Sequence, residues 1–420
     1  MIRLDKFFLS DFFRKESLKN SIFWSFVGNL IFLGCQWLVM IVLARMSTPF
    51  LAGQYAIALG FTMPVIAICQ MQLTQIQITD IKKEHSLKDY FVFRSIMLLI
   101  GFLLILLLTT IFYTSDLKLI VFLFITKSFE SLGEVVYGHL QLSDKFKELA
   151  FIKIFRGILT ISTVIFCVYS KLDLGKMTMV LSLISFFIFL LVEYRLIISL
   201  VRKDTFGKWM GFKKIFIVAF PLGLSSGLNS VTTNLPRYFL NYYYGKEVVG
   251  FFSVVYSPIT WLSLIPGVMS QVILPKTAYY LQNKQLKEYM TIIMKYTIIV
   301  SAFFIFIVFV FNIWGEELLT ILFGHEYSKF SSLLKILSIS LIIANVGCIG
   351  PYTISASRSF WSQFFAIVIS FFTMVLGCYF GARSNWINIG WAEVLRESVG
   401  MLYYLTVAYF IIGKLKPLKI

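Results

Sequence analysis

Ionisable side chains recur inside the long apolar segments of this chain, and the segment from residue 118 to 140 holds the densest set. Spacings of 3, 4 and 7 place four polar residues on one helix face: Lys127, Glu130, Glu134 and Gln141. Glu130 lies one turn from Lys127, so it either forms a local ion pair or takes part in chemistry. Glu134 has no opposite charge close by in sequence, which favours it as the group that takes up H+ or Na+.

A second cationic face is predicted in the apolar segment from residue 149 to 169. One side of this helix would carry two cations and two hydroxyls: Lys153, Arg156, Thr160 and Thr163. If this helix packs beside the previous one, Arg156 is the expected partner of Glu134. Another cation of the apolar segments, Arg94, lies near a span end, and we expect its head group to reach the lipid headgroups.

The stretch from Ala219 to Gly250 is apolar enough for a bilayer, yet it contains Arg237. Ser226, Ser230, Thr233 and Arg237 recur on one helix face, with Asn229 between them. Pro221 and Pro236 each remove a backbone hydrogen bond, so we expect the helix to bend or open at two places. Either the polar face lines a cavity, or the stretch is a packing helix whose Gly223-x-x-x-Gly227 pair admits a close neighbour.

Together these polar faces predict a hydrated, cation-lined cavity, which favours an anionic cargo. The side-chain amides could bind sugar hydroxyls of this cargo. The candidate substrate-binding residues are Arg237, Arg156, Lys127, Asn234, Asn229 and Gln36, and the candidate coupling residues are Glu134 and Glu130. Any one of them could instead tie helices together. The same choice applies to Glu393, Arg396 and Glu397, which form either a structural clamp or a functional group.

The helices that must position these residues are membrane spans. Of 420 residues, 58% are hydrophobic and 14% are charged, against about 25% charged in soluble domains. Apolar runs of about 20 residues favour α-helical spans over a β-barrel. The net charge of +17 lies largely between the spans, where it meets lipid headgroups, so we expect no nucleic-acid partner. The cysteines lack metal-type spacing, and phosphate-loop and metalloprotease motifs are absent from the sequence, so we expect no cofactor, metal or enzyme activity.

We predict an all-α integral membrane protein with about twelve transmembrane helices. The expected spans are residues 21–44, 54–77, 90–112, 118–140, 149–169, 177–199, 215–240, 249–273, 289–312, 330–352, 360–381 and 388–412. Lys and Arg in the connections are distributed about 22 to 7 between the two sides of the membrane. The termini lie on the richer side, which predicts that both are cytoplasmic. The first 20 residues are too polar for a cleavable signal sequence, so we expect the first span to be retained.

The spans divide six and six at a basic connection, which predicts one lobe from residue 1 to 205 and another from 206 to 420. Gly53-Gln54-Tyr55-Ala56 and Gly250-Phe251-Phe252-Ser253 begin equivalent spans at an offset of 197 residues, as expected for a pseudo-symmetric repeat. The connections between spans are too short for an extramembrane catalytic domain.

Several segments resemble the bacterial polysaccharide flippases for O-antigen, capsule and related glycans. These belong to the MATE-like multidrug, oligosaccharidyl-lipid and polysaccharide exporter superfamily. The resemblance rests on the run Gln72 to Asp80, on Phe129-Glu130-Ser131-Leu132, Tyr137-Gly138-His139-Leu140-Gln141 and Phe155-Arg156-Gly157, on Pro221-Leu222-Gly223 and Asn234-Leu235-Pro236-Arg237-Tyr238, and on Leu322-Phe323-Gly324 and Ser355-Ala356-Ser357-Arg358.

The resemblance implies two six-helix lobes in a V around a central cavity. It also implies that a polyprenyl-pyrophosphate-linked oligosaccharide moves from the cytoplasmic to the outer leaflet of the bacterial cell membrane by alternating access. The implied partners are this lipid-linked glycan, the bilayer, H+ or Na+, and the glycan polymerase machinery. A MATE-type drug or cation antiporter is the alternative, although cationic drugs favour an acidic cavity. A membrane glycan polymerase or ligase would need a sizeable outer loop.

Overall fold

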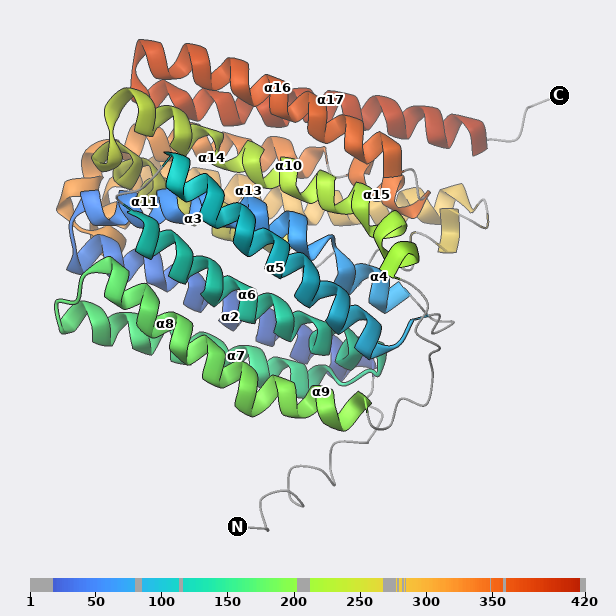
Figure 1. Ribbon diagram of the computed structural model, residues 1–420. Coiled ribbons are helices and arrows are strands. Elements are labelled where there is room, and N and C mark those ends of the chain that lie inside the picture. The colour runs from blue at the N-terminus through green and yellow to red at the C-terminus, as the bar shows by residue number, and fades with distance from the viewer. Residues whose placement is uncertain are drawn as a thin grey trace. The chain divides into compact units, whose positions relative to one another are not determined.

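The computed structural model describes residues 18–79, 85–112, 116–201, 212–266, 285–347, 349–357 and 360–415, and a few positions between 277 and 283. Within these residues the regular elements are helices, which confirms the all-α prediction (Figure 1). Ten of the described helices, some of them joined end to end, are long and apolar enough to cross a membrane. The protein is therefore a multi-pass membrane protein, and the count of about twelve spans stays a prediction.

Apolar runs form helices here because a bilayer offers no water to backbone N–H and C=O groups, which must then bond within the segment. In the first half the helices are α2 (Leu18–Met46), α3 (Pro49–Gln70), α4 (Leu73–Thr79), α5 (Leu87–Phe112), α6 (Leu117–Leu142), α7 (Phe146–Tyr169), α8 (Leu174–Ile188), η2 (Phe189–Glu193) and α9 (Tyr194–Val201). In the second half they are α10 (Phe212–Tyr244), α11 (Lys246–Leu262), α13 (Leu286–Phe323), η3 (His325–Phe330), α14 (Ser331–Val346), α15 (Ile349–Ala356), α16 (Phe360–Ser384), η4 (Trp386–Ile389) and α17 (Gly390–Leu415).

Two predicted spans are interrupted. The span expected at 54–77 breaks after α3, where Met71 and Gln72 both adopt left-handed backbone conformations with φ near 48° and 49°. The span expected at 177–199 continues from α8 through a π-helical turn, η2, into α9. A π-turn adds one residue to a helical turn and so changes which side chains face a neighbour.

Helix α10 runs without a break from Phe212 to Tyr244, through both Pro221 and Pro236, so it opens at neither proline. A bend at these two residues stays a prediction. The close approach predicted for its Gly pair is present. A Cβ atom on Gly227 would lie 2.2 Å from Ile68 Cγ1, and one on Gly223 would lie 2.6 Å from Met71 Cγ.

The chain folds into two compact units, residues 1–39 with 61–227 and residues 40–60 with 228–420. In the first unit, α6 packs against α5, α7 and α8 (Figure 1). In the second unit, α17 packs against α14, α15 and α16, and α14 also packs against α11 and α13. The lobe boundary predicted between residues 205 and 206 lies outside the described residues, as does the N-terminal segment before residue 18.

An internal two-fold relation is visible within the second unit, where the start of α3 meets the start of α11. A Cβ atom on Gly53 would lie 1.8 Å from the Lys246 carbonyl oxygen, and one on Gly250 would lie 1.8 Å from the Pro49 carbonyl oxygen. Pro49 and Lys246 are separated by the same 197 residues as Gly53 and Gly250. Equivalent residues of the sequence repeat therefore make reciprocal contacts, and only glycine allows the two backbones to approach so closely.

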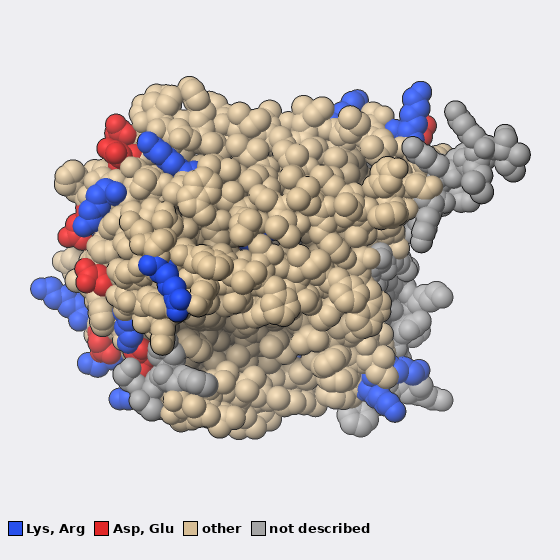
Figure 2. All heavy atoms as spheres, turned by 90° about the horizontal axis from the view of Figure 1, so that it is seen from above, with Lys and Arg blue, Asp and Glu red and all other residues tan. Residues whose placement is uncertain are grey.

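Charge is unevenly distributed on the face drawn in Figure 2. Lys, Arg, Asp and Glu gather toward two opposite ends of this face, and the broad region between them consists almost entirely of other residues. Large apolar side chains are also exposed on individual helices, for example Leu99, Leu103 and Leu107 on α5, and such side chains suit a hydrocarbon solvent.

Candidate functional site

The polar stripe predicted on α6 is present. The helical turn that holds Lys127 and Glu130 contacts α2. Lys127 Nζ lies 2.8 Å from Glu130 Oε2, which is the local ion pair expected from their i,i+3 spacing. Gln36 on α2 completes the group. Its Oε1 accepts from Lys127 Nζ at 3.3 Å, and its Nε2 donates to Glu130 Oε1 at 3.5 Å. Three predicted site residues thus form one cluster.

The next turn of α6 meets α5. Arg94 is 1% exposed, and it donates through Nη1 to Ser131 Oγ at 2.9 Å and lies 3.6 Å from Glu134 Oε2. The expectation that Arg94 reaches the headgroups is wrong, because α5 turns this side chain inward to the polar stripe. The Glu134 side chain remains 38% exposed. It is therefore a partly exposed carboxylate whose direct ion-pair partner, Arg94, is buried.

A third cluster joins α6, α7 and the π-turn η2. Glu193 is fully buried, and its Oε2 accepts from Arg156 Nη2 at 2.7 Å while its Oε1 accepts from Tyr137 Oη at 2.5 Å. Gly133 leaves the space for this carboxylate, since a Cβ there would lie 2.4 Å from Glu193 Oε2. The predicted pairing of Arg156 with Glu134 is therefore wrong, because the π-turn presents Glu193 to Arg156.

Lys153 on α7 lies one turn before Arg156 and has a different environment. Its Nζ donates to Asn29 Oδ1 on α2 at 2.7 Å and lies 5.5 Å from the centre of the Tyr137 ring. Asn29 in turn donates from Nδ2 to the Ser25 carbonyl at 2.8 Å, which orients its Oδ1 toward the lysine. The hydrogen-bond acceptor of this partly buried cation is thus a neutral amide.

In the second unit, Arg237 projects from α10 among neutral groups. Its Nε donates to Ser253 Oγ on α11 at 3.1 Å, and its Nη1 donates to Asn234 Oδ1. Asn234 is held in turn, because its Nδ2 donates to the Ser230 carbonyl at 2.8 Å. The structure therefore brings Arg237 and Asn234 together, while the Asn229 side chain is exposed.

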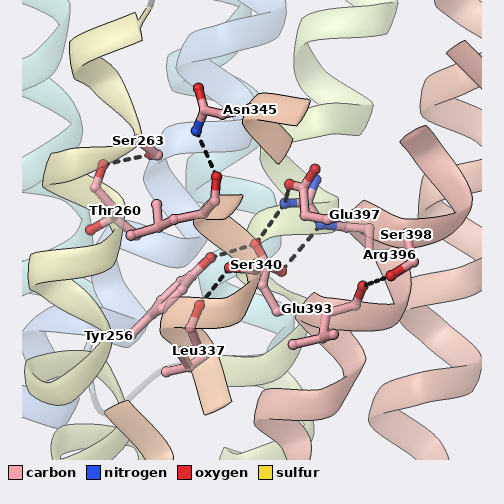
Figure 3. Close-up of polar contacts among 12 residues, drawn as sticks. Tyr256, Thr260, Ser263, Leu337, Ser340, Asn345, Glu393, Arg396, Glu397 and Ser398 are labelled. Carbon is pink, nitrogen blue, oxygen red and sulfur yellow. Dashed lines mark hydrogen bonds and ion pairs between the residues drawn. The ribbon is translucent and has the colours of Figure 1, made fainter. Parts of the chain in front are cut away.

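The acidic and basic residues of α17 form a clamp within the second unit, shown in Figure 3. Arg396 donates from Nη2 to Glu393 Oε1 at 2.6 Å and from Nε to Oε2 at 3.1 Å, and it also pairs with Glu397. Tyr256 on α11 donates to Glu393 Oε1 at 2.8 Å, so the clamp ties α11 to α17. This geometry favours a structural clamp over a functional group for these three residues.

Two residues of these clusters, Glu193 and Tyr256, were missed from the sequence, and the inward orientation of a third, Arg94, was predicted wrongly. A signal for Glu193 existed, since it is a single carboxylate within an apolar run at the end of span 177–199. Counting carboxylates inside spans alongside cations would have found it. Nothing in the sequence marks Tyr256, because tyrosine is common in membrane helices.

Chemically, the clusters supply cations and hydrogen-bond donors inside a low-dielectric region, which suits the binding of an oxyanion or the exchange of a proton at Glu134. Within the described part of the chain, His, Cys, Asp and Glu form no group of three or more that could hold a metal ion. The four cysteines whose state the structure describes, Cys35, Cys69, Cys167 and Cys378, are buried and free.

Comparison with known structures shows the fold. The lipid II flippase MurJ in an inward closed conformation superimposes with a TM-score of 0.70 at 14% identity, covering 93% of this chain and 89% of MurJ. The MATE transporter VcmN of Vibrio cholerae gives a TM-score of 0.67 at 13% identity, covering 94% of this chain and 95% of VcmN. Identities this low establish a shared MATE-like architecture and nothing more specific.

Sequence comparison is more informative. The capsular polysaccharide biosynthesis protein CapF of Staphylococcus aureus is 28% identical over 345 residues, which are 80% of this chain and 85% of CapF. Residues 18–281, more than half of the chain, match the family described as polysaccharide biosynthesis protein. The chain, with its MATE-like helical fold and its buried charged clusters, therefore belongs to the polysaccharide biosynthesis protein family.

Proposed function

We propose that this protein is a flippase for cell-surface polysaccharide assembly. It moves a polyprenyl-pyrophosphate-linked oligosaccharide from the cytoplasmic to the outer leaflet of a bacterial cell membrane by alternating access. Family membership, the similarity to a capsular polysaccharide biosynthesis protein and the MATE-like fold support this proposal. The excess of Lys and Arg on one side of the predicted spans supports cytoplasmic termini.

The observation that carries the proposal is the environment of Arg237. Its hydrogen-bond acceptors are the neutral oxygens of Asn234 and Ser253, so its charge is not consumed by an ion pair with either. A guanidinium in this state can bind a phosphate through two parallel hydrogen bonds. Asn234 and Ser253 position the guanidinium, while Nη2 and the second N–H of Nη1 bind the pyrophosphate.

The remaining predicted site residues fit supporting roles. Lys127, Gln36 and Asn229 can bind sugar hydroxyls or a second oxyanion, and Arg156 can do so when its pair with Glu193 separates. Glu130 pairs with Lys127, which leaves Glu134, with its exposed carboxylate, as the better group for coupling to H+ or Na+.

Membrane potential is the alternative energy source to this coupling. Moving about two negative charges outward across about 100 mV yields roughly 4 to 5 kcal/mol. We further propose that the glycan polymerase machinery receives the cargo at the outer leaflet.

The experiment is export by Arg237 variants in a strain that lacks its own flippase. Arg237→Ala should abolish surface glycan and cause the lipid-linked oligosaccharide to accumulate, while Arg237→Lys should retain part of the export. Arg383→Ala is the matched control, because Arg383 is an arginine of the same unit that stacks on Tyr379 with 4.1 Å between its Cζ and the ring centre. Full export by Arg237→Ala, at equal amounts of inserted protein, would remove Arg237 from the mechanism.

A further inference from the structure

The charged groups on the polar faces of α5, α6 and α7 and on the π-turn η2 do not balance one another. Three cations of the polar faces on α5, α6 and α7 each lie within 4 Å of a carboxylate: Arg94 with Glu134, Lys127 with Glu130, and Arg156 with Glu193. The fourth cation, Lys153, has no carboxylate within that distance among the described residues. One positive charge therefore remains in a region where an unbalanced charge is costly.

The surroundings of Lys153 hold its ammonium in place without a direct ion pair, although Glu134, which pairs with Arg94, acts on it from a longer distance. Asn29 Oδ1 accepts one of its three N–H groups at 2.7 Å, and the Tyr137 ring lies 5.5 Å from Nζ. Both neighbours are themselves fixed, Asn29 by the Ser25 carbonyl and Tyr137 by Glu193. The lysine is thus preorganised with free hydrogen-bonding capacity, which lowers the cost of binding an anion.

We infer that Lys153 contacts the cargo and binds one of its oxyanions, an inference that rests on the proposed flippase function. A phosphate of the lipid carrier and a carboxylate of an acidic sugar offer the same chemistry to an ammonium. Arg156, one turn away, is 1% exposed and holds Glu193 through Nη2, whereas Lys153 is partly exposed and has no carboxylate within 4 Å among the described residues. Lys153 can therefore meet the cargo without the loss of an ion pair.

The test is direct binding to the purified full-length protein in lipid nanodiscs. Farnesyl pyrophosphate, compared with farnesol, probes the phosphate, and a tetrasaccharide containing glucuronate, compared with its methyl ester, probes the sugar carboxylate. The variants are Lys153→Gln, which keeps an N–H donor for Asn29 but removes the charge, and Lys153→Arg, which keeps the charge. Lys147→Gln is the matched control, since it removes a lysine charge from the exposed first turn of the same helix.

Lys153→Gln should weaken binding of one anionic probe about tenfold or more, because a hydrogen bond to a charged group is lost. Binding of farnesol and of the methyl ester should not change, and Lys153→Arg and Lys147→Gln should bind like the wild type. A loss confined to farnesyl pyrophosphate identifies the phosphate, and a loss confined to glucuronate identifies the sugar. If the Gln variant does not elute as a folded protein, Lys153→Met, which retains the apolar stem, replaces it.

Three results would overturn the inference. If the wild type and Lys153→Gln bind an anionic probe with equal affinity, Lys153 does not bind the oxyanion, and the flippase proposal is unaffected. Wild-type protein that binds neither anionic probe contradicts both together. A loss in Lys153→Gln that is equal for the charged probes and their neutral counterparts would show a structural role only.

Discussion

The buried pair of Arg156 and Glu193 allows a quantitative test of what holds the first unit together. Their side chains are 1% and 0% exposed, and Nη2 and Oε2 lie 2.7 Å apart. Glu193→Gln removes the negative charge and leaves the buried guanidinium without its directly bonded counter-ion. Breaking a buried ion pair in this way costs about 3 to 5 kcal/mol. The lower end applies here, since the amide oxygen of Gln can still accept from Arg156 or from Tyr137.

The assay is thermal unfolding of the purified protein, followed by intrinsic fluorescence. A loss of about 3 kcal/mol predicts that Tm falls by roughly 3 to 4 °C, because the unfolding entropy of a chain this long makes the shift per kcal/mol small. Lys176→Gln is the control, because its pair with Asp173 spans 3.4 Å between side chains that are 71% and 62% exposed. An exposed pair contributes little, so Tm should barely change.

A double variant distinguishes the effect of losing the Arg156–Glu193 ion pair from the effect of leaving one buried charge unpaired. Replacing both residues, Arg156→Gln with Glu193→Gln, removes the unpaired charge and should restore part of the stability lost in Glu193→Gln alone. If the double variant is instead less stable by the sum of the two single losses, the reasoning from an uncompensated buried charge is wrong. A Glu193→Gln protein that unfolds at the wild-type temperature would refute it more simply.

Two further predictions concern packing in the second unit. Gly53→Ala and Gly250→Ala should each lower Tm by a similar amount, because either Cβ would meet a backbone carbonyl of the facing helix at 1.8 Å. Gly34→Ala, where a Cβ would have nothing within 4 Å, should instead leave Tm unchanged or raise it, and the same response at Gly53 would disprove the reciprocal contact. Tyr256→Phe removes the 2.8 Å hydrogen bond to Glu393 and should cost about 1 kcal/mol in unfolding free energy. Equal chemical stability of the Phe variant and the wild type would show that α11 and α17 are held by apolar contacts alone.

Much of the secondary structure follows from the sequence because the solvent is a bilayer. The prediction of a helix at 90–112 is close to α5, Leu87–Phe112, and the prediction at 149–169 is close to α7, Phe146–Tyr169. Local pairs follow equally well. The ion pair of Lys127 with Glu130 and that of Arg396 with Glu393 both join residues three apart, so helix geometry alone brings them together.

Tertiary structure decided the partners of the remaining charges. Periodicity places Arg156 on a polar face of its helix, but it contains no information on which neighbour that face meets. The π-turn at Phe189–Glu193 rotates a carboxylate onto Arg156, and α5 supplies Arg94 to Glu134. An apolar span can be predicted from local composition, because each residue contributes to the mean hydropathy independently. A buried ion pair depends on the rotation and register of two helices that are packed together, and those quantities exist only once the chain has folded.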